Sequence, residues 1–479
     1  MMKKSKGKVK LLLFAFLFLA VSFTRFYNIE KTTRFTRDES QNLVDIHRIF
    51  VDRDITLIGP IDGTKTIIYP SLTFYLLLPF AYLGNFEPAS PAYGTAFFGI
   101  LTVGLVLYLI KRINSKLLLW VGVLIIIWYP LLESSRWAWN PHLVPFFTFL
   151  AIIFYLKGGK IGKFVSGVAL GLSFHLHYLS VFSFFTFAAV VFFLDIYKKR
   201  YKEAVVMPFG FFLTIIPFIY FDLKNPPGLF FNYFIKHNMF TAGAGGELLS
   251  FPQTLITNSF ESLKYLTQSE HLAYILIPLL LIFFYKNLKA KSKYLVFLIP
   301  TIAQVAAISF LPTFGNRYFL LALPFFVTWL FYKRSKEILM IQKLIILLFI
   351  LGSMFSLRGV LTKPIYPPGA FVVSESIHHI KGISSSRNLK NINIAVLASE
   401  DNDPLGTIYR HTALVEGVDL LLENQFEITD NLFVVSTSEE TVVREDPANV
   451  MNGFRSGELV DTFNVETTDW RVYLFNRDK

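Results

Sequence analysis

The sequence predicts a polytopic α-helical membrane protein that ends in a small soluble α/β domain, and three observations carry this prediction. Hydrophobic residues make up 53% of the 479 residues and aromatic residues 17%, with 52 phenylalanines. Apolar stretches, several of them long enough to cross a bilayer, recur between residues 92 and 357. From residue 365 onward the composition becomes that of a soluble protein, with 9 Lys and Arg against 18 Asp and Glu.

The net charge of +12 and the absence of cysteine exclude several classes of protein and site. Basic residues concentrate in short connections between apolar segments, as they do in cytoplasmic loops, so the charge does not indicate nucleic-acid binding. A chain without cysteine forms no disulfide, thiolate metal site or cysteine nucleophile. No cofactor is indicated, and a divalent metal is compatible with the outer carboxylates without being indicated by any ligand spacing.

The N-terminal segment is expected to be a membrane anchor. Residues 1 to 10 carry five lysines, and residues 11 to 23 are continuously apolar. A cleaved signal peptide has the same pattern, but the many spans that follow favour an uncleaved anchor. Either alternative places the next loop, residues 28 to 84, outside the cytoplasm.

This outer loop opens with a predicted helix. Thr36 and Glu39 have capping-box spacing, so the helix is expected to begin there with Asp38 in its first turn, where the helix dipole favours a carboxylate. Leu43 and Phe50 fall on one apolar face. The helix is therefore expected to lie on the bilayer surface.

Residues 72 to 83 decide the predicted topology. The segment is about a dozen residues long and contains Pro79, whereas a span needs about 20 residues, so it is expected to be re-entrant or interfacial. With this choice the basic connections fall on the cytoplasmic side, and about eleven spans leave the N-terminus inside and the C-terminus outside a plasma membrane. The later spans are predicted at residues 92–110, 117–133, 143–156, 164–177, 180–197, 204–221, 271–285, 294–311, 317–332 and 339–357.

The sequence divides into a transmembrane module, residues 1–364, and a soluble extracytoplasmic domain, residues 365–479. Within the module, a second long outer loop at residues 222–270 contains a glycine-rich linker and then an amphipathic segment, residues 252–268, that predicts another interfacial helix. In the C-terminal domain, strands are predicted at 392–398, 432–436 and 472–475, and helices at 374–381 and 407–414.

Polar residues of the membrane module collect at its outer loops and outer span ends. Sugar transfer from a polyprenyl phosphate suits such a chamber, because the acidic phosphate leaving group needs cations and the acceptor hydroxyl needs one carboxylate base. A hydrolase would need a second carboxyl group as acid. A transporter would more often bury charge at the bilayer midplane on broken, repeated helices, and the sequence shows no such repeat.

The order of short motifs resembles the GT-C superfamily of membrane glycosyltransferases. An outer loop with Asp38-Glu39 follows the first span, Tyr69-Pro-Ser-Leu-Thr-Phe-Tyr stands where the family often has His-Pro-Pro-Leu-Tyr-Tyr, and Arg317-Tyr318 comes later. Over residues 5 to 335 the chain is most similar to the protein O-mannosyltransferase and aminoarabinose-transferase-like group, which includes bacterial lipopolysaccharide-core transferases. Because Tyr69 replaces the usual histidine, any phosphate or metal role of that histidine is not carried over.

The resemblance implies an inverting hexosyl- or pentosyltransferase that moves a sugar from a polyprenyl-phosphate donor to an extracytoplasmic glycan, lipid or protein. Asp38 would be the general base, with Glu39 as its support or substitute. Candidate donor-phosphate ligands are Arg136, Arg317 and Lys65. Candidate pocket residues are Tyr69, Asn140, His142, His175, His177 and Tyr318.

Simpler explanations exist for several of these residues. The capping box alone accounts for Glu39, and a dipole-stabilising acid accounts for Asp38. Arg136 and Arg317 could contact lipid headgroups. His175 and His177 lie on different faces of a helix, so they do not predict a metal site. Two other functions stay open: an oligosaccharide ligase or polymerase acting on lipid-linked saccharide, and a transporter or flippase of lipid-linked sugars.

Overall fold

The computed structural model describes residues 2–61, 67–226, 228–230, 251–289, 295–310, 316–332, 335–363, 368–397 and 404–477. The chain forms two compact units. Unit 1 comprises Met1–Tyr27, Leu57–Thr73 and Thr95–Gly359, and unit 2 comprises Asn28–Thr56, Phe74–Gly94 and Val360–Lys479. Much of the first outer loop therefore packs with the C-terminal part of the chain. The predicted division at residue 364 stays a prediction.

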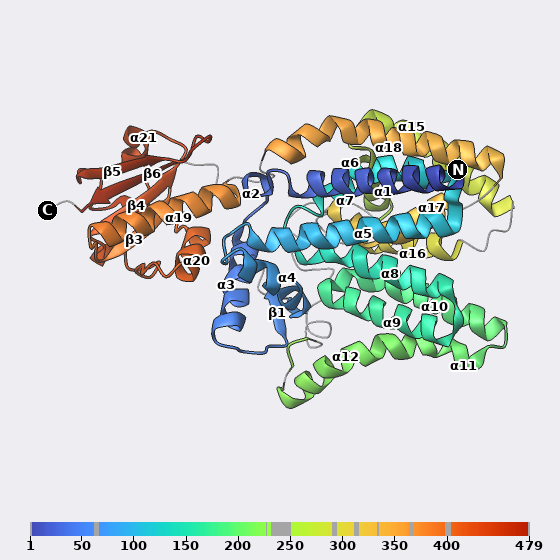
Figure 1. Ribbon diagram of the computed structural model, residues 1–479. Coiled ribbons are helices and arrows are strands. Elements are labelled where there is room, and N and C mark those ends of the chain that lie inside the picture. Colours follow the sequence, from blue (N-terminus) through green and yellow to red (C-terminus); the bar gives the residue numbers. More distant parts are fainter. Residues whose placement is uncertain are drawn as a thin grey trace. The chain divides into compact units, whose positions relative to one another are not determined.

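Unit 1 is built almost entirely of helices (Figure 1). A two-stranded antiparallel ribbon, β1 (Ile58–Ile61) with β2 (Ile68–Pro70), also belongs to it. Its helices, some of which extend into unit 2, are α1 (Met2–Phe26), α5 (Ser90–Asn114), α6 (Leu118–Ile127), α7 (Tyr129–Glu133), α8 (Val144–Lys157), α9 (Gly159–Leu176), α10 (Val181–Tyr197), α11 (Tyr201–Ala204), α12 (Val206–Lys224), α14 (Phe251–Thr267), α15 (Glu270–Lys289), α16 (Leu295–Ile308), α17 (Leu323–Phe331) and α18 (Lys336–Thr362).

The described helices make the chain a multi-pass membrane protein. Six stretches are long and apolar enough to cross a bilayer: Ser90–Ile127, Asn140–Lys157, Tyr178–Tyr197, Tyr201–Lys224, Glu270–Leu288 and Lys336–Thr362. Three apolar helices are shorter, namely Ala15–Phe26, Leu72–Leu83 and Leu295–Ile308. The 12-residue helix α4 (Leu72–Leu83) is thus shorter than the roughly 20 residues of a span, as predicted. The count of eleven spans stays a prediction.

Close backbone contact joins α9 to α12. A Cβ atom on Gly167 would lie 2.1 Å from the Met207 carbonyl oxygen, and one on Gly210 would lie 2.4 Å from the Phe164 carbonyl oxygen. Only glycine fits at both positions. Small residues at the interface of membrane helices allow this approach and increase van der Waals contact.

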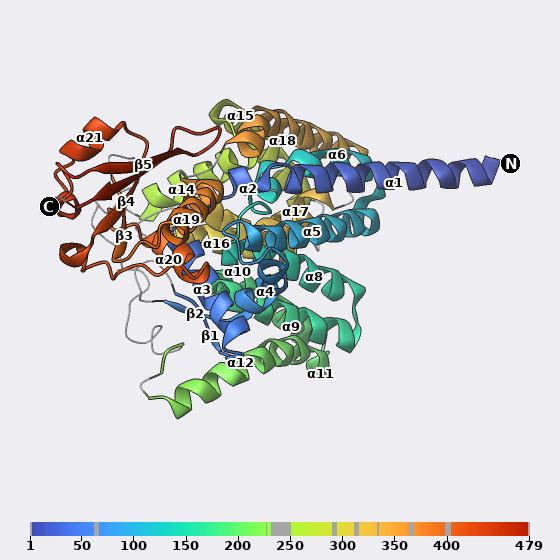
Figure 2. The ribbon, with the colours of Figure 1, turned by 60° about the vertical axis from the view of Figure 1, so that its left-hand side comes forward.

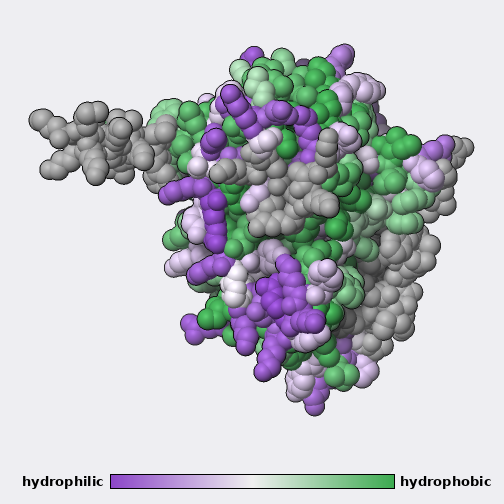
Figure 3. Space-filling model, turned by 90° about the vertical axis from the view of Figure 1, so that its right-hand side faces the viewer, coloured by the Kyte–Doolittle hydropathy of each residue, from purple (hydrophilic) through white to green (hydrophobic). Residues whose placement is uncertain are grey.

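Several basic connections of unit 1 lie at the same end of the helices as the N-terminus (Figures 1 and 2). Seen from that end, hydrophilic side chains form patches among hydrophobic ones (Figure 3). Some of the charges are paired: Lys163 Nζ lies 2.5 Å from Asp195 Oδ2 and 2.7 Å from Glu203 Oε2, and Arg200 also binds Asp195. Asp195 is buried, so these cations provide the charge compensation that burial requires.

Unit 2 contains a mixed four-stranded sheet in the order β3-β4-β6-β5. β3 pairs with β4 in parallel, and the other two pairings are antiparallel. The strands are β3 (Ile392–Val396), β4 (Asn431–Ser436), β5 (Leu459–Asn464) and β6 (Arg471–Asn476), and the helices are α2 (Ile29–Thr32), α3 (Arg37–Val51), most of α4, α19 (Gly369–Ser386), α20 (Thr407–Val415) and α21 (Glu440–Glu445). Three predicted strands and both predicted helices are confirmed. The sequence missed β5, whose residues are all half-exposed or exposed at the sheet edge, so its apolar alternation is weak.

Candidate functional site

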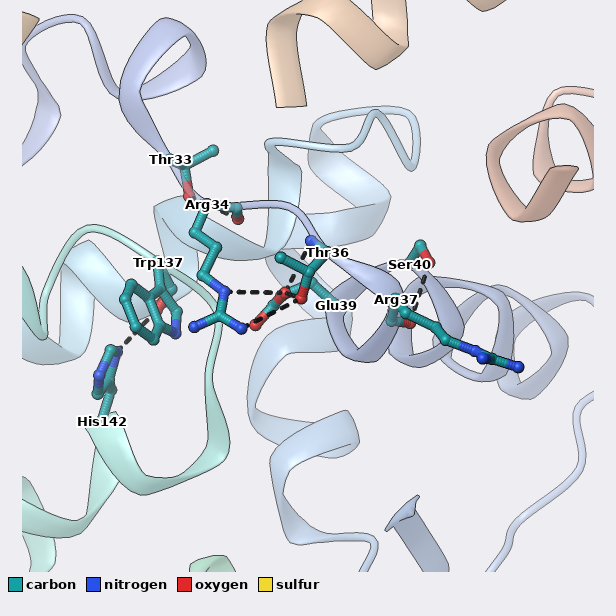
Figure 4. Close-up of polar contacts among 8 residues, drawn as sticks. All are labelled: Thr33, Arg34, Thr36, Arg37, Glu39, Ser40, Trp137 and His142. Carbon is teal, nitrogen blue, oxygen red and sulfur yellow. Dashed lines mark hydrogen bonds and ion pairs between the residues drawn. The ribbon is translucent and has the colours of Figure 1, made fainter. Parts of the chain in front are cut away.

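The start of α3 has the predicted capping box. The Thr36 backbone N–H and hydroxyl both donate to Glu39 Oε2, at 2.8 and 2.5 Å, and Arg34 Nε lies 3.8 Å from the same oxygen (Figure 4). Glu39 is buried, and these contacts stabilise the helix start. Asp38 lies in the same first turn, where the unpaired N–H groups of the helix stabilise a carboxylate. A catalytic role for Glu39 stays a prediction.

Part of the apolar face of α3 packs on protein, whereas the predicted position of the helix on the bilayer surface stays a prediction. Leu43 and Ile46 are 1% exposed. The Phe50 ring lies 4.7 Å from the Tyr82 ring and 5.4 Å from the Phe86 ring, centroid to centroid, and α3 also contacts α20. Amphipathic spacing shows that a face is buried but does not distinguish protein from lipid as its partner.

His411, on α20, is a residue that the sequence analysis missed. Its Nδ1 lies 2.9 Å from Ser40 Oγ, and Ser40 Oγ also lies 3.0 Å from the Arg37 carbonyl oxygen. A hydroxyl has a single proton. When that proton goes to the carbonyl, His411 Nδ1–H donates to Ser40, two residues after Asp38. The sequence separation of 371 residues left no local signal for this contact.

The position of α20 is itself held by Arg410. Its guanidinium donates to the carbonyl oxygens of Leu405 and Leu421, at 2.6 and 2.7 Å, and to Asn393 Oδ1 at 2.5 Å. These bonds connect α20 to the first strand of the sheet. His411 therefore reaches α3 from a fixed helix.

In unit 1, the Arg136 side chain caps the C-terminal end of α1. Its Nη1 donates to the carbonyl oxygens of Thr24 and Arg25, at 2.7 and 3.1 Å, and its Nη2 donates to that of Tyr27 at 2.8 Å. Burial lowers the pKa of the Arg136 guanidinium to about 10, so it remains charged at neutral pH. A cation at the carbonyl end of a helix interacts favourably with the helix dipole. This contact is structural, and the predicted contact with donor phosphate stays a prediction.

Arg25 makes a similar contact at the end of another helix. From the last turn of α1 it donates to the carbonyl oxygens of Ile125 and Ile126, at 2.7 and 2.6 Å, where α6 ends. Arg25 is fully buried. Two buried arginines therefore satisfy helix carbonyl groups near the point where both helices end.

Four of the predicted pocket residues come together in an aromatic cluster of unit 1. The rings of Tyr69 and Tyr318 each lie 5.4 Å from the His177 ring, centroid to centroid. The Trp139 ring lies 5.2 Å from His142 and 6.4 Å from His177. We name Tyr69, Trp139, His142, His177 and Tyr318 the aromatic cluster. Within the part of the chain that the structure describes, His177 Nδ1 is buried and has no hydrogen-bond partner.

The remaining predicted residues are distributed differently. Asn140 Nδ2 donates to the Leu176 carbonyl oxygen at 2.5 Å, which joins the segment after Trp139 to the end of α9. His142 Nδ1 donates to the Trp137 carbonyl oxygen at 3.2 Å (Figure 4). His175 lies apart, with its ring 4.7 Å from the Phe218 ring. Lys65 and the Arg317 side chain lie outside the described residues.

One group of side chains among the described residues could hold a metal ion. Ligand atoms of Glu87, His378 and Glu416, all in unit 2, lie within 4.8 Å of one another. Protein partners already account for them: His378 Nε2 lies 2.9 Å from Glu87 Oε1, Ser374 donates to Glu87 Oε2 at 2.6 Å, and Lys381 Nζ lies 2.9 Å from Glu416 Oε2. The sequence analysis had not connected these residues.

An apolar groove of about 450 Å³ lies among the helices of unit 1. We name it the α14–α16 groove. Side chains of α14, α15 and α16 line it together with Phe319, Phe326 and Trp329, and the lining is almost wholly apolar. Such a surface fits a hydrocarbon chain rather than a polar ligand.

The comparisons with known proteins identify the fold. No protein-family model and no curated protein matches the chain. Two crystal structures of ArnT from Cupriavidus metallidurans do match, both with a TM-score of 0.59. The apo structure is 13% identical and is matched over 98% of both chains, and the structure bound to undecaprenyl phosphate is 12% identical over 97% of this chain and 98% of that chain.

The chain has a GT-C fold. The match extends over nearly the whole chain, so both units belong to it. This GT-C fold was predicted from the order of short motifs, and the structure confirms it. At such low identity the likeness establishes architecture, and activity has to be argued from the chain's own residues.

Proposed function

We propose that this GT-C protein is a glycosyltransferase that moves a sugar from a polyprenyl-phosphate donor to an extracytoplasmic acceptor. The observation that carries the proposal is the fold likeness over 97% of the chain to an ArnT structure bound to undecaprenyl phosphate. The α14–α16 groove supports it, because a polyprenyl donor needs apolar surface for its tail.

In this proposal Asp38 is the general base for the acceptor hydroxyl. A carboxylate fits the reaction because the phosphate leaves without needing a proton, so one base suffices for inverting transfer of a hexosyl or pentosyl group. Glu39 orders the helix that holds Asp38. Arg317, Lys65 and Arg136 are proposed as phosphate ligands, and the aromatic cluster with Asn140 and His175 as the pocket wall.

The proposed orientation follows from charge. The basic N-terminus and the connections after α5, α8 and α10 would face the cytoplasm, in agreement with the positive-inside rule. Residues 365–479 would then form an extracytoplasmic domain of a plasma-membrane protein. No soluble nucleotide sugar takes part.

The decisive experiment measures sugar transfer from synthetic polyprenyl-phosphate sugars by the intact protein in proteoliposomes. We expect consumption of at least one donor and a new glycoside on a saccharide, lipid or peptide acceptor. Movement of the donor between leaflets without consumption would instead identify a flippase. Consumption of diphosphate-linked oligosaccharide alone would identify a ligase or polymerase.

A substitution in the α14–α16 groove should impair long-chain donors selectively. Val305→Trp places a large ring on the groove wall. Loss of about two methylene-sized contacts, about 0.8 kcal/mol each, should raise KM for a 55-carbon donor roughly tenfold and leave a 10-carbon donor unaffected. Ile299→Trp is the matched control, because Ile299 is an exposed residue of the same helix outside the groove. Equal KM values for the two chain lengths in Val305→Trp would contradict the assignment.

His411 should act as a positioning residue for the proposed base. His411→Ala removes the bond to Ser40 and frees the first turn of α3, so we expect kcat to fall on the order of tenfold, with donor KM unchanged. Amide hydrogen exchange at residues 37–41 should accelerate in the same variant. His411→Asn, which keeps a donor at a similar reach, should restore part of the rate. Unchanged exchange and unchanged kcat together would exclude the positioning role.

A further inference from the structure

Unit 2 contains a half-open pocket of about 580 Å³ to which no function has yet been assigned. We name it the hairpin pocket, because one wall is the turn between β5 and β6. Its volume falls in the range of small-molecule sites. It is lined by Asn28, Lys31, Thr362, Pro368, Phe371, Val372, Thr437, Thr467, Thr468, Asp469 and Trp470.

The lining combines hydroxyl groups with aromatic rings. Four threonines, one asparagine, one lysine and one aspartate supply polar atoms, and Phe371 and Trp470 supply rings. Sugars present hydroxyl groups that both donate and accept, and apolar C–H faces that pack on aromatic rings. A lining of both kinds suits such a ligand.

The charges of the lining residues favour a neutral ligand over a phosphate. Lys31 is the one cation and Asp469 the one anion among the described lining residues. Lys31 Nζ already lies 4.7 Å from the centre of the Phe371 ring and 3.4 Å from Thr467 Oγ1. Phosphate sites need an excess of cations or convergent N–H groups, and the described lining residues carry no excess of cations. A neutral ligand fits better.

The β5–β6 turn is rigidly built. The Val465 N–H donates to the Trp470 carbonyl oxygen at 2.9 Å, and Thr468 Oγ1 donates to the Val465 carbonyl oxygen at 2.9 Å. Thr467 has a φ of 63°, a left-handed conformation that β-branched residues rarely adopt. These bonds hold that conformation and fix the four residues, Thr467 to Trp470, that the turn contributes to the pocket.

The opposite wall is anchored as well. Asn28 Nδ2 donates to the Leu361 carbonyl oxygen at 3.2 Å, and the Ala370 N–H lies 3.5 Å from the Thr33 carbonyl oxygen. α2 and the start of α19 are thereby joined. A pocket whose walls are fixed binds without the entropy cost of ordering them.

We propose that the hairpin pocket binds a short neutral saccharide. The inference rests on the proposed function, in which this saccharide is part of the acceptor glycan. Asp469 would accept hydrogen bonds from sugar hydroxyls, Lys31 would donate one, and Trp470 and Phe371 would contact the ring faces. The C-terminal part of the chain would thus select the acceptor, while donor chemistry takes place elsewhere.

Direct binding to the full-length protein in detergent tests the proposal. Saturation-transfer difference NMR would use three neutral probes, maltotriose, mannotriose and chitotriose, with no donor present. We expect at least one to bind, and Asp469→Ala and Lys31→Met each to weaken it roughly tenfold, as loss of a charged hydrogen-bonding group does. Asp419→Ala is the matched control, because Asp419 is an exposed carboxylate of the same unit outside the pocket.

Three outcomes would overturn the proposal: no binding of any probe, equal binding by the pocket variants and the control, or displacement of the probe by inorganic phosphate. Binding is read without transfer, so this test and the transfer assay fail independently. If the proposed function holds as well, Asp469→Ala should raise acceptor KM and leave donor KM unchanged.

Discussion

Asp38→Asn should lower sugar transfer by on the order of a hundredfold or more while leaving donor binding largely intact, because it removes the proposed base and keeps the shape of the side chain. Asparagine also suits the start of a helix, so the fold of α3 should survive. The measurement is initial transfer rate in proteoliposomes together with donor affinity. Glu39→Gln should have a smaller effect on rate and a larger one on stability, because Glu39 completes the capping box.

The matched control is Asp52→Asn, the same substitution at the other end of the same helix. Asp52 is exposed, and its Oδ2 lies 3.9 Å from Arg48 Nε. Such a surface ion pair contributes little to stability. The Asp52→Asn variant should transfer at the rate of the unmodified protein. Normal sugar transfer by Asp38→Asn would contradict the assignment of Asp38 as the base. Absence of transfer by the unmodified protein would contradict the proposal that the protein is a transferase.

Arg136→Met should be the most destabilising of the substitutions considered. It leaves three carbonyl oxygens at the end of α1 without their donor in a buried place. Each bond to a charged donor contributes about 1.5–3 kcal/mol, so the loss of three such bonds should cost about 4.5 kcal/mol or more. The measurement is the thermal unfolding midpoint in detergent, which should fall by many degrees.

Arg112→Met separates this effect from the loss of a surface cation. Arg112 is exposed and donates to one helix-end carbonyl, that of Leu156, at 2.8 Å. Its replacement should change the midpoint little. The unfolding midpoint of Arg136→Lys should lie between those of the other two variants, because a lysine ammonium cannot reproduce the planar arrangement of N–H donors of a guanidinium. If Arg136→Met unfolds at the same temperature as the unmodified protein but no longer binds donor, Arg136 is a phosphate ligand rather than a helix cap.

Local features of unit 2 could be predicted because their causes lie within a few residues. The capping box needs only Thr36 and Glu39, three positions apart, and the helix starts where that spacing places it. The buried strands β3, β4 and β6 were visible as short apolar runs. The half-exposed edge strand β5 was not, because its alternation is incomplete.

The candidate site was predictable only in part. Tyr69, His142, His177 and Tyr318 were grouped because all were assigned to the outer ends of spans, and the structure does bring them together. Arg136 was predicted to bind the donor phosphate or lipid headgroups, whereas the structure gives it backbone carbonyl partners that no sequence pattern marks. The contact of His411 with Ser40 joins residues 371 positions apart.

The sequence by itself determined that the chain is a multi-pass membrane protein, that a helix begins at residue 37 with two carboxylates in its first turn, and that a sheet follows near the C-terminus, whereas the GT-C fold was predicted from a resemblance in the order of short motifs. Periodicity, capping and composition are short-range properties, so they can be found in a single sequence. The tertiary structure decided that Leu43 and Ile46 of α3 pack on protein, that Arg25 and Arg136 bind carbonyl groups at the ends of α6 and α1, and that residues from both ends of the chain line the hairpin pocket. These contacts depend on how distant segments pack, and packing partners are not encoded in local spacing.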